Sequence, residues 1–461
     1  MPVFDPLEVA RWCRGAWEPA APPALCGVSH DTRTLTAGNL FFALRGPRFD
    51  GHEFVTRAFE RGAAGAVVRR EARLAADPGG PLLRVGEPGA ALREIATGYR
   101  LKQAVGIVAV TGSAGKSTVK EMTAQMLSTA MATARSPGNW NNEIGLPLSL
   151  LAMEPEAKAG VFELGTNHPG EIAILSGMLK PDWGVVTNIG PVHMEFFDSI
   201  EAIAREKASL LAHLPADGAA VLNADSDFFG LLRDAAPGRV IRVSVKAGAD
   251  YHCLPDAGTG ELEIREARTG DAARLPSPLP GAHNAMNAAQ AAAVARGHGV
   301  SWEGVRSALA AYRPLPMRWE ERHAAGIRII NDAYNANPMN MRAALRAFAQ
   351  EPGPGSKWLV LGGMLELGRM EDEAHAALGG FAGQGAWEGI VVVGVAGEKI
   401  AAGAERAGFA SAHLFRCATA TDAAEVIRTR VKAGGSVLVK ASRGFRLEQV
   451  VEDLVSGNRG A

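Results

Sequence analysis

The sequence predicts an α/β protein made of three domains with mainly parallel sheets. At 461 residues, the chain is longer than one ordinary hydrophobic core supports. Short apolar runs alternate with stretches of helical spacing, which is the pattern of parallel β/α units. A proline-containing stretch near residue 315 separates the last of these units from the others. We therefore predict domains over residues 1–86, 87–312 and 313–461.

Composition excludes several classes of protein. Hydrophobic residues make up 47% of the chain and charged residues 21%, as in globular proteins. A formal net charge of −1 predicts no nucleic-acid partner, and no apolar run is long enough for stable membrane insertion. The four cysteines are scattered, and the first residues show no basic segment followed by an apolar stretch. We expect a cytoplasmic protein, and we expect it to act as a monomer.

The first domain contains three apolar runs that predict buried strands, over residues 40–44, 65–68 and 81–85. A helix is expected from Glu87, at the start of the second domain.

The stretch GIVAVTGSAGKSTVKEM (residues 106–122) has the organisation of a phosphate-binding loop with unusual spacing. The common loop has four residues between its first glycine and Gly-Lys-Ser/Thr, and Val110 stands at that first position here. Residues 107–110 nevertheless predict a buried strand, and residues 111–115 predict a small flexible turn. Apolar residues return at helical spacing after Lys116.

This context allows the loop to bind phosphate. Backbone N–H groups at the start of a helix hold an anion, and Lys116 adds a positive charge. Ser117 or Thr118 could ligate a Mg²⁺ ion that bridges phosphates. The alternative is a glycine turn beside a solvated lysine, but the strand, the loop and the amphipathic helix all favour phosphate binding.

Polar residues follow the next predicted strands, over residues 161–164, 184–187 and 219–222. Ligands bind beyond the carboxyl ends of parallel strands, where Glu163 and His193 stand. A carboxylate and an imidazole beside a phosphate loop suit a divalent metal ion. Considered singly, Glu163 could equally be a cap or a surface carboxylate, and an ordinary loop histidine would be favoured for His193. Together with the phosphate loop, they favour a metal site.

Asparagines gather in two places. NWNNEIG carries Asn139, Asn141 and Asn142 ahead of a helix, where they could simply cap the helix or shape a turn. Asn284 and Asn287 lie at the start of a helix predicted over residues 284–296, so both could face one ligand. A second helix is expected to end near residue 312.

The third domain is expected to follow a linker over residues 313–322, RPLPMRWEER. Asp332 could accept ribose hydroxyl groups at the end of a strand. Lys440, Ser442 and Arg443 could form either a carboxylate clamp or a solvated turn. The predicted strands cover residues 327–330, 358–361, 389–393 and 436–439.

Lys207 falls on the apolar stripe of a helix predicted within residues 198–214, formed by Ile200, Ile203, Leu210 and Leu214. The periodicity alone favours a lysine that packs its stem and reaches water with its ammonium group. In a dry site, however, a lysine loses its proton more easily, and the neutral amine can take up carbon dioxide to form a carbamate.

Taken in order, these motifs resemble those of the Mur ligases, the ATP-dependent amide-forming enzymes of peptidoglycan synthesis. TGSAGKST is similar to the short loop of that family, T-G-x-x-G-K-[TS]-[TS]. SHDTRTLTAGNLFFALRGPRFDGHEF resembles its uridine-nucleotide-binding domain. Four further stretches resemble the family member that adds a dipeptide: NWNNEIGLPLSLL, FELGTNHPGEIAIL, DAYNANPMNMRAAL and LGGMLELG.

The resemblance implies a reaction and its partners. With ATP and Mg²⁺, the enzyme would phosphorylate the tripeptide carboxylate of UDP-N-acetylmuramoyl-tripeptide, and D-alanyl-D-alanine would attack the resulting acyl phosphate. The three domains would be a small UDP-binding domain, a central ATPase domain and a C-terminal Rossmann-like domain, which close over the two substrates.

The resemblance also implies the residues of the site. The catalytic residues would be Lys116, His193 and Lys207. The nucleotide would contact Thr111, Gly112, Ser113, Ala114, Gly115, Lys116, Ser117, Thr118, His283, Asn284, Asn287, Arg318 and Asp332. The Mg²⁺ ligands would be Ser117, Glu163, His193 and a carbamylated Lys207. The substrates would contact Ser29, Arg33, Asp50, His52, Asn139, Asn142, Tyr334, Asn335, Asn337, Lys440, Ser442 and Arg443.

The chain departs from the family pattern at three positions. Thr32 and Asn340 stand where the family usually has serine, and Gly363 stands where it usually has aspartate. The last two bear on substrate contacts in the C-terminal domain and not on the type of reaction.

Two alternatives are weighed against this interpretation. The sister ligase that adds a diamino acid as the third residue carries Asp-Asn-Pro-Arg, a run that this chain lacks. A nucleotide-dependent switch would bind partners without ligation, but the Asn-Lys-x-Asp run of a GTPase is also missing. Phosphate release that requires both substrates would separate a ligase from a switch.

Overall fold

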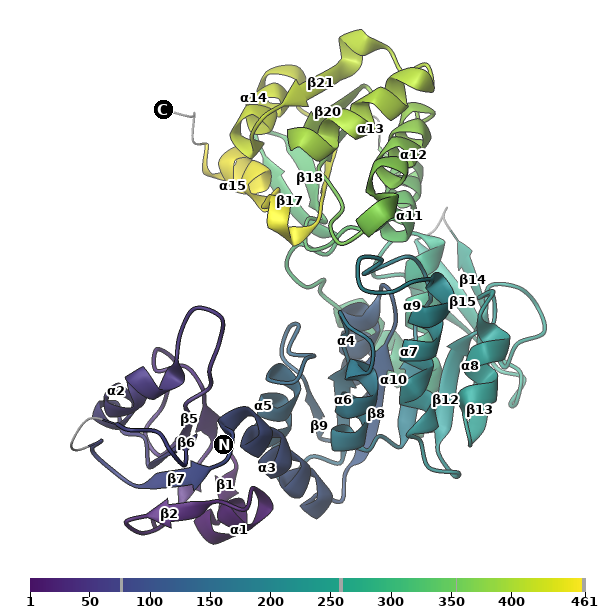
Figure 1. Cartoon of the computed structure of the whole chain (residues 1–461). Coiled ribbons are helices and arrows are strands. Elements are labelled where there is room, and N and C mark those ends of the chain that lie inside the picture. The colour runs from purple at the N-terminus through teal and green to yellow at the C-terminus, as the bar shows by residue number, and fades with distance from the viewer. Residues whose placement is uncertain (75–77, 257–259, 354, 458–461) are drawn as a thin grey trace.

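The computed structural model describes residues 1–74, 78–256, 260–353 and 355–457, and three lobes follow one another along the chain (Figure 1). Each lobe contains one large sheet with helices packed on it, so the predicted α/β class is confirmed. The domain boundaries at residues 86/87 and 312/313 stay predictions. Within the described residues, we find no helix with the length and apolar character that crossing a membrane demands.

The N-terminal lobe is built from β1 (Val3–Phe4), α1 (Pro6–Trp12), β2 (Ala16–Glu18), β3 (Leu25–Cys26), β4 (Val28–Ser29), β5 (Leu40–Phe42), a 3₁₀ turn (Gly51–Phe54), α2 (Val55–Glu60), β6 (Gly65–Arg69) and β7 (Leu82–Val85). Its sheet has the order β2-β7-β6-β5-β4 and is parallel except at β2. Neighbouring side chains of β5 enter different cores, Phe41 on one face and Phe42 on the other. This strand is therefore buried on both faces, which explains its continuous apolar run.

The central lobe is built from α3 (Pro88–Lys102), β8 (Gly106–Thr111), α4 (Lys116–Leu127), β9 (Thr133–Arg135), α5 (Gly145–Leu151), β10 (Ala159–Glu163), α6 (Glu171–Leu179), β11 (Trp183–Val186), α7 (Ile200–Ala212), β12 (Ala219–Asn223), α8 (Phe229–Ala235), β13 (Arg239–Ser244), β14 (Tyr251–Asp256), β15 (Glu261–Glu266), β16 (Ala272–Pro276), α9 (Ala282–Gly297) and α10 (Trp302–Ala311). Its nine-stranded sheet has the order β16-β15-β14-β13-β12-β11-β8-β10-β9. Within the described residues of this sheet, β14–β15 and β15–β16 are the antiparallel pairs, and the other pairs are parallel.

Strand β8 lies inside this sheet and is covered on both faces. Val108 and Val110 enter the core formed with α4, α9 and α10, whereas Ile107 and Ala109 enter the core formed with α3, α5, α6 and α7. Both neighbours of β8 are parallel to it, so the carboxyl ends of β8, β10 and β11 lie side by side. This edge positions the phosphate loop beside Glu163.

The C-terminal lobe is built from β17 (Glu320–Ala324), β18 (Ile327–Asn331), α11 (Pro338–Gln350), β19 (Lys357–Leu361), a 3₁₀ turn (Gly368–Met370), α12 (Glu371–Gly383), β20 (Gly389–Val393), α13 (Gly394–Arg406), a 3₁₀ turn (Ser411–His413), β21 (Leu414–Cys417), α14 (Ala420–Arg430), β22 (Ser436–Lys440), a 3₁₀ turn (Arg443–Phe445) and α15 (Glu448–Ser456). Its sheet has the order β17-β18-β22-β19-β20-β21 and is parallel except at β17. Leu359 and Leu361 pack in the core formed with α11, α12 and α13, and Val360 packs in the core formed with α14 and α15.

Two parts of the sequence behave differently from expectation. The linker prediction was wrong for residues 320–322, because they form β17, an edge strand whose side chains are mostly exposed and therefore polar. Strands β13 to β16 were not predicted. Their apolar positions are few and interrupted by charged residues, since this end of the sheet is partly open to solvent.

Candidate active site

The phosphate-binding loop lies between the end of β8 and the first turn of α4 (Figure 1). Gly115 directly precedes Lys116 and has a φ of +79°. A β-carbon on Gly115 would lie 2.6 Å from Asn287 Oδ1, and one on Gly112, whose φ is +147°, would lie 1.9 Å from Thr187 Oγ1. Backbone angle and close approach therefore both require glycine at these two positions. The short spacing of the glycines in the motif therefore corresponds to a compact loop that packs against the end of β11 and the first turns of α9.

Residues that follow β11 anchor this loop. The Asn188 carbonyl accepts a hydrogen bond from Ser113 N–H at 2.9 Å, and Asn188 Oδ1 accepts one from Ala114 N–H at 2.9 Å. The Thr187 hydroxyl donates to the Ala114 carbonyl at 2.5 Å. Neither Thr187 nor Asn188 is assigned to the site from the sequence, because a polar residue at a strand end gives no signal for its partner.

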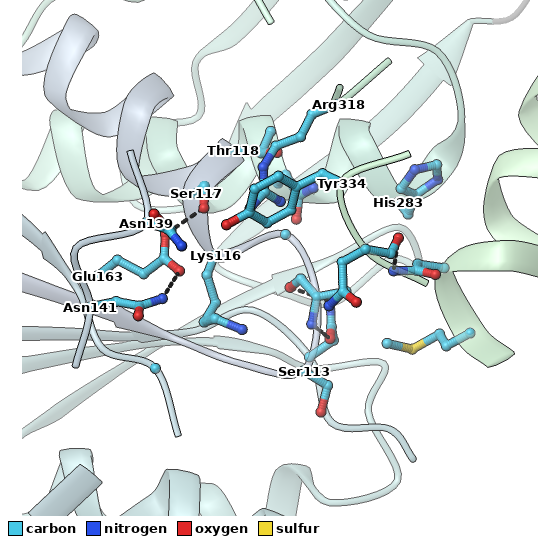
Figure 2. Close-up of a pocket in the computed structure, with 18 of the residues that line it drawn as sticks. Ser113, Lys116, Ser117, Thr118, Asn139, Asn141, Glu163, His283, Arg318 and Tyr334 are labelled. Atoms are coloured by element: carbon cyan, nitrogen blue, oxygen red, sulfur yellow. Dashed lines mark hydrogen bonds between the residues drawn. The ribbon is translucent and has the colours of Figure 1, made fainter. Parts of the chain in front are cut away.

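Glu163 supplies a buried carboxylate at the end of β10, with 1% of its surface exposed. Its Oε2 accepts a hydrogen bond from the Ser117 hydroxyl at 2.5 Å, and its Oε1 accepts one from Asn141 Nδ2 at 2.7 Å (Figure 2). Lys116 Nζ lies nearby and donates to the Gly112 carbonyl at 3.0 Å.

The Ser117 and Glu163 oxygens fit Mg²⁺. Mg²⁺ is commonly bound by one or two carboxylates together with hydroxyl, phosphate and water oxygens. In the described parts of the chain, no group of three or more His, Cys, Asp and Glu side chains could hold a metal ion. Phosphate and water oxygens would therefore supply part of the coordination.

His193 lies in the loop after β11 and lines the same cavity as Glu163. Its Nδ1 is hydrogen-bonded to the Glu366 carboxylate of the C-terminal lobe. Both residues have φ values near +60°, which are uncommon outside glycine. The role of His193 as a metal ligand stays a prediction.

Lys207 lies in the middle of α7, and only 1% of its surface is exposed. The alternative of an ammonium group that reaches water is therefore wrong. Burial, together with the positive charge of Lys116, lowers the pKa of Lys207 to about 7, although Glu206 opposes the shift. The lowered pKa favours the neutral amine, which carbamate formation requires.

A cavity of about 540 Å³ lies between the central and C-terminal lobes. The Arg318 guanidinium lies 3.9 Å from the centre of the Tyr334 ring within it, a cation–π contact that positions both side chains (Figure 2). The structure brings most of the predicted residues together here: Ser113, Ala114, Gly115, Lys116, Ser117, Thr118, Asn139, Asn142, Glu163, His193, His283, Asn284, Asn287, Arg318, Asp332, Tyr334, Asn335 and Lys440. Asn141 and Asn188 also line the cavity without having been assigned to it.

Other predicted residues do not line this cavity: Thr111, Gly112, Lys207, Asn337, Ser442 and Arg443. The residues of the expected carboxylate clamp are engaged with protein groups. Lys440 Nζ donates to Asp332 Oδ2 at 2.7 Å, the Ser442 hydroxyl donates to the Ala336 carbonyl at 3.1 Å, and Arg443 pairs with Glu448 at 3.2 Å. Their contacts with substrate stay predictions.

The predicted N-terminal residues, which include the buried Ser29, lie in the N-terminal lobe and not in this cavity. Arg33 pairs with Asp31 at 2.6 Å, and His52 Nδ1 lies 2.6 Å from Asp50 Oδ1. These pairs shape two loops of that lobe, and their contacts with a uridine nucleotide stay predictions.

Two departures from the family pattern have a structural explanation. Asn340 forms a capping box with Asn337 at the start of α11, with both reciprocal hydrogen bonds at 2.8 Å. A β-carbon on Gly363 would lie 2.3 Å from the Phe445 ring, which fills the space that an aspartate would need.

Comparison with known proteins agrees with this geometry. Three family models match: the Mur ligase family catalytic domain over residues 25–124, the Mur ligase middle domain over residues 110–295 and the Mur ligase glutamate ligase domain over residues 317–443. The chain belongs to the Mur ligase family.

Its relatives include a particular member of that family. The UDP-N-acetylmuramoyl-tripeptide–D-alanyl-D-alanine ligase of Bacillus subtilis is 35% identical over 434 residues, which cover 93% of each chain. A crystal structure of MurF from Acinetobacter baumannii aligns with a TM-score of 0.89 at 29% identity and covers 98% of this chain and 99% of that one. MurF ligase from Thermotoga maritima in complex with ADP aligns with a TM-score of 0.78 at 28% identity, over 92% of this chain and 96% of that one.

Proposed function

We propose that this enzyme uses ATP to join D-alanyl-D-alanine to the tripeptide carboxylate of UDP-N-acetylmuramoyl-tripeptide. The observation that carries the proposal is the buried Ser117–Glu163 pair beside a phosphate loop, in a cavity that the C-terminal lobe completes. The relatives named above, which match over nearly the whole chain, support the choice of substrates.

The chemistry requires an activated carboxylate, because an oxide is a poor leaving group. Transfer of the terminal phosphoryl group of ATP would give an acyl phosphate. The amine of D-alanyl-D-alanine would then attack the acyl carbon, lose a proton and displace phosphate. Loop N–H groups and the Lys116 ammonium group would hold the transferring phosphoryl group and offset its charge.

Ser117 and Glu163 would hold Mg²⁺, which would neutralise part of the phosphate charge when bound. His193 would join them as a further ligand. Lys207 would contribute as a carbamate, since its buried amine loses its proton readily and the carbamate is an oxygen-rich anion.

ATP would contact five residues on the nucleotide side of the cavity: His283, Asn284, Asn287, Arg318 and Asp332. The N-terminal lobe would bind the UDP end of the other substrate through Ser29, Arg33, Asp50 and His52. We further propose that the enzyme acts in the cytoplasm as a monomer, with no nucleic-acid or membrane partner.

The test is a phosphate-release assay with UDP-muramoyl-peptides and a set of amine acceptors. We expect release to require both the tripeptide substrate and D-alanyl-D-alanine, with a preference of at least about 10-fold over free D-alanine, L-lysine or diaminopimelate. Faster ligation of a free diamino acid onto a UDP-muramoyl-dipeptide would assign the chain to the sister ligase. Hydrolysis that ignores the acceptor would favour a nucleotide switch.

A further inference from the structure

Lys120 is a fully buried lysine that the proposed chemistry does not use. It lies in α4, three residues after Ser117, and none of its surface is exposed. Its Nζ donates to the carbonyls of Ser136 and Gly138 at 2.7 and 2.9 Å and lies 2.8 Å from Glu121 Oε1. An ammonium group has three donors, and each has an acceptor here.

The two carbonyls belong to the loop of residues 136–142, between β9 and α5. This loop holds Glu163 at two points. The Ser136 hydroxyl accepts a hydrogen bond from Glu163 N–H at 3.2 Å, and Asn141 Nδ2 donates to the Glu163 carboxylate at 2.7 Å (Figure 2). The Asn141 carbonyl also accepts a hydrogen bond from Gly165 N–H at 2.8 Å, so the loop is tied to the chain on both sides of Leu164.

Two residues of α4 therefore act on the Glu163 carboxylate, one directly and one through the loop. Ser117 contacts Glu163 directly, and Lys120, on the same side of α4 one turn later, contacts the loop that orients Glu163. A charged group is costly to bury, and a hydrophobic residue of similar volume would serve packing alone. The hydrogen bonds of Lys120 therefore indicate that its charge serves to hold the loop in position.

We propose that Lys120 is a positioning residue: by fixing the loop of residues 136–142, it aims the Glu163 carboxylate at the Mg²⁺–nucleotide site. This inference rests on the proposed function, because it concerns the same site. It assigns to Lys120 no contact with substrate or metal. Groups that orient metal ligands typically change metal affinity when they are removed.

The decisive measurement is the equilibrium affinity of a fluorescent ADP, with Mg²⁺ and with EDTA in place of Mg²⁺. In the Lys120→Met variant, which keeps the volume and removes the donors, we expect the strengthening of ADP binding by Mg²⁺ to fall about 10-fold, with affinity in EDTA within about twofold of the parent. Val119→Ala is the matched control, because it loosens the packing of the same helix at a fully buried position. We expect it to lower the melting temperature and to leave the Mg²⁺ effect unchanged.

A double-mutant cycle with Lys120→Met and Asn141→Ala then tests whether Lys120 acts on Glu163 through Asn141 of the loop. If Lys120 acts through the loop, Lys120→Met adds little to the loss of Mg²⁺ effect already caused by Asn141→Ala. Lys120→Met removes one of the two cations paired with Glu121, the other being Arg135. The pair Lys120→Met with Glu121→Gln therefore replaces the single variant should that variant fail to fold.

The outcomes separate the two proposals. A parent protein that shows no strengthening of ADP binding by Mg²⁺ contradicts the proposed function. A parent that shows it, together with a folded Lys120 variant that retains it in full, overturns the positioning role alone. Additive losses in the cycle would also overturn the route through Asn141.

Discussion

Lys116 opens α4 with its ammonium group turned back over the loop, where Nζ reaches the Gly112 carbonyl at 3.0 Å. Lys116→Ala removes the charge that would face the transferring phosphoryl group. We expect turnover to fall about 100- to 1000-fold, the range found when one preorganised donor is removed from a charged transition state. The measurement is phosphate release with both substrates at saturation.

The same variant should fold normally. Without ligand, its melting temperature should stay within about 3 °C of the parent, the shift expected from about 1 kcal/mol in a large domain. Lys102→Ala is the control: it removes a half-exposed lysine of α3 that pairs with Glu8 and does not line the cavity, so it should leave turnover unchanged. Near-normal turnover in Lys116→Ala would count against phosphate binding by this loop.

Lys207 makes a second prediction at the residue scale. Lys207→Ala removes the amine that would carry the carbamate, and we expect at least about a 100-fold loss of turnover with partial recovery in acetate or another small carboxylate. Lys207→Met is the control: its side chain fills the space, so added carboxylate should not rescue it. Full activity in Lys207→Ala would refute the carbamate.

The depressed pKa of Lys207 also predicts a pH dependence of stability in buffer free of carbon dioxide. The pKa is about 7 in the folded protein and 10.5 in the reference state, so the unfolded chain binds more protons between these values. The free energy of unfolding contributed by this group must therefore rise with pH across that window. Urea unfolding at pH 7, 8 and 9 should show the parent gaining stability relative to Lys207→Met. A constant difference between the two proteins would contradict the pKa shift.

At the scale of elements, the loop between β8 and α4 depends on the close contact of Gly112 with the end of β11. Gly112→Ala would place a β-carbon 1.9 Å from the Thr187 hydroxyl, and Thr187 is itself buried. We expect a loss of more than about 2 kcal/mol in the free energy of unfolding, because overpacking adds to the cost of a positive φ.

Gly170→Ala is the matched control for this prediction. Gly170 has a φ of +90° at the start of α6, with nothing within 4 Å of its ideal β-carbon position, so only the backbone cost of about 1 kcal/mol applies. Urea unfolding without nucleotide measures both variants. Equal losses in the free energy of unfolding of the two variants would show that the close contact with Thr187 adds no cost to Gly112→Ala.

At the scale of the whole molecule, the central and C-terminal lobes meet through the loop that contains Glu366. Its carboxylate is hydrogen-bonded to His193, and its carbonyl accepts a hydrogen bond from Glu195 N–H at 3.3 Å. Arg369 adds a contact to the Asp198 carbonyl at 3.4 Å. In this conformation, the C-terminal lobe therefore binds the imidazole of His193, which we propose as a Mg²⁺ ligand.

Removing the Glu366 carboxylate should loosen the contact between these lobes in the absence of ligand. In Glu366→Ala, we expect the distance distribution between labels on the central and C-terminal lobes, measured by single-molecule FRET, to broaden toward larger separations. Glu373→Ala, which removes an exposed carboxylate from α12, is the control and should leave the distribution unchanged. An unaltered distribution in Glu366→Ala would mean that other contacts hold the lobes together.

The strands that are covered on both faces, and the edge of the sheet at which the site lies, could be predicted from local periodicity. Buried strands such as β8 and β10 appear as apolar runs because both of their faces are covered, and the residue at each carboxyl end can then be named, as Glu163 was. The family motifs added residues such as Arg318, which the structure places beside Tyr334 in the cavity. These features depend on local periodicity and short motifs, which one sequence contains in full.

The partners of the polar side chains could not be predicted from the sequence. Asp332 meets Lys440 across 108 residues, and His193 meets Glu366 across 173. In the sequence, Lys120 has the context of an ordinary helix lysine. Only in the folded structure do the carbonyls of Ser136 and Gly138 lie within hydrogen-bond distance of its Nζ. The physical reason is that a hydrogen bond forms within about 3 Å and at a restricted angle. Which groups satisfy that condition is set by how strands and helices far apart in the sequence pack together, and not by the residues beside them in the chain.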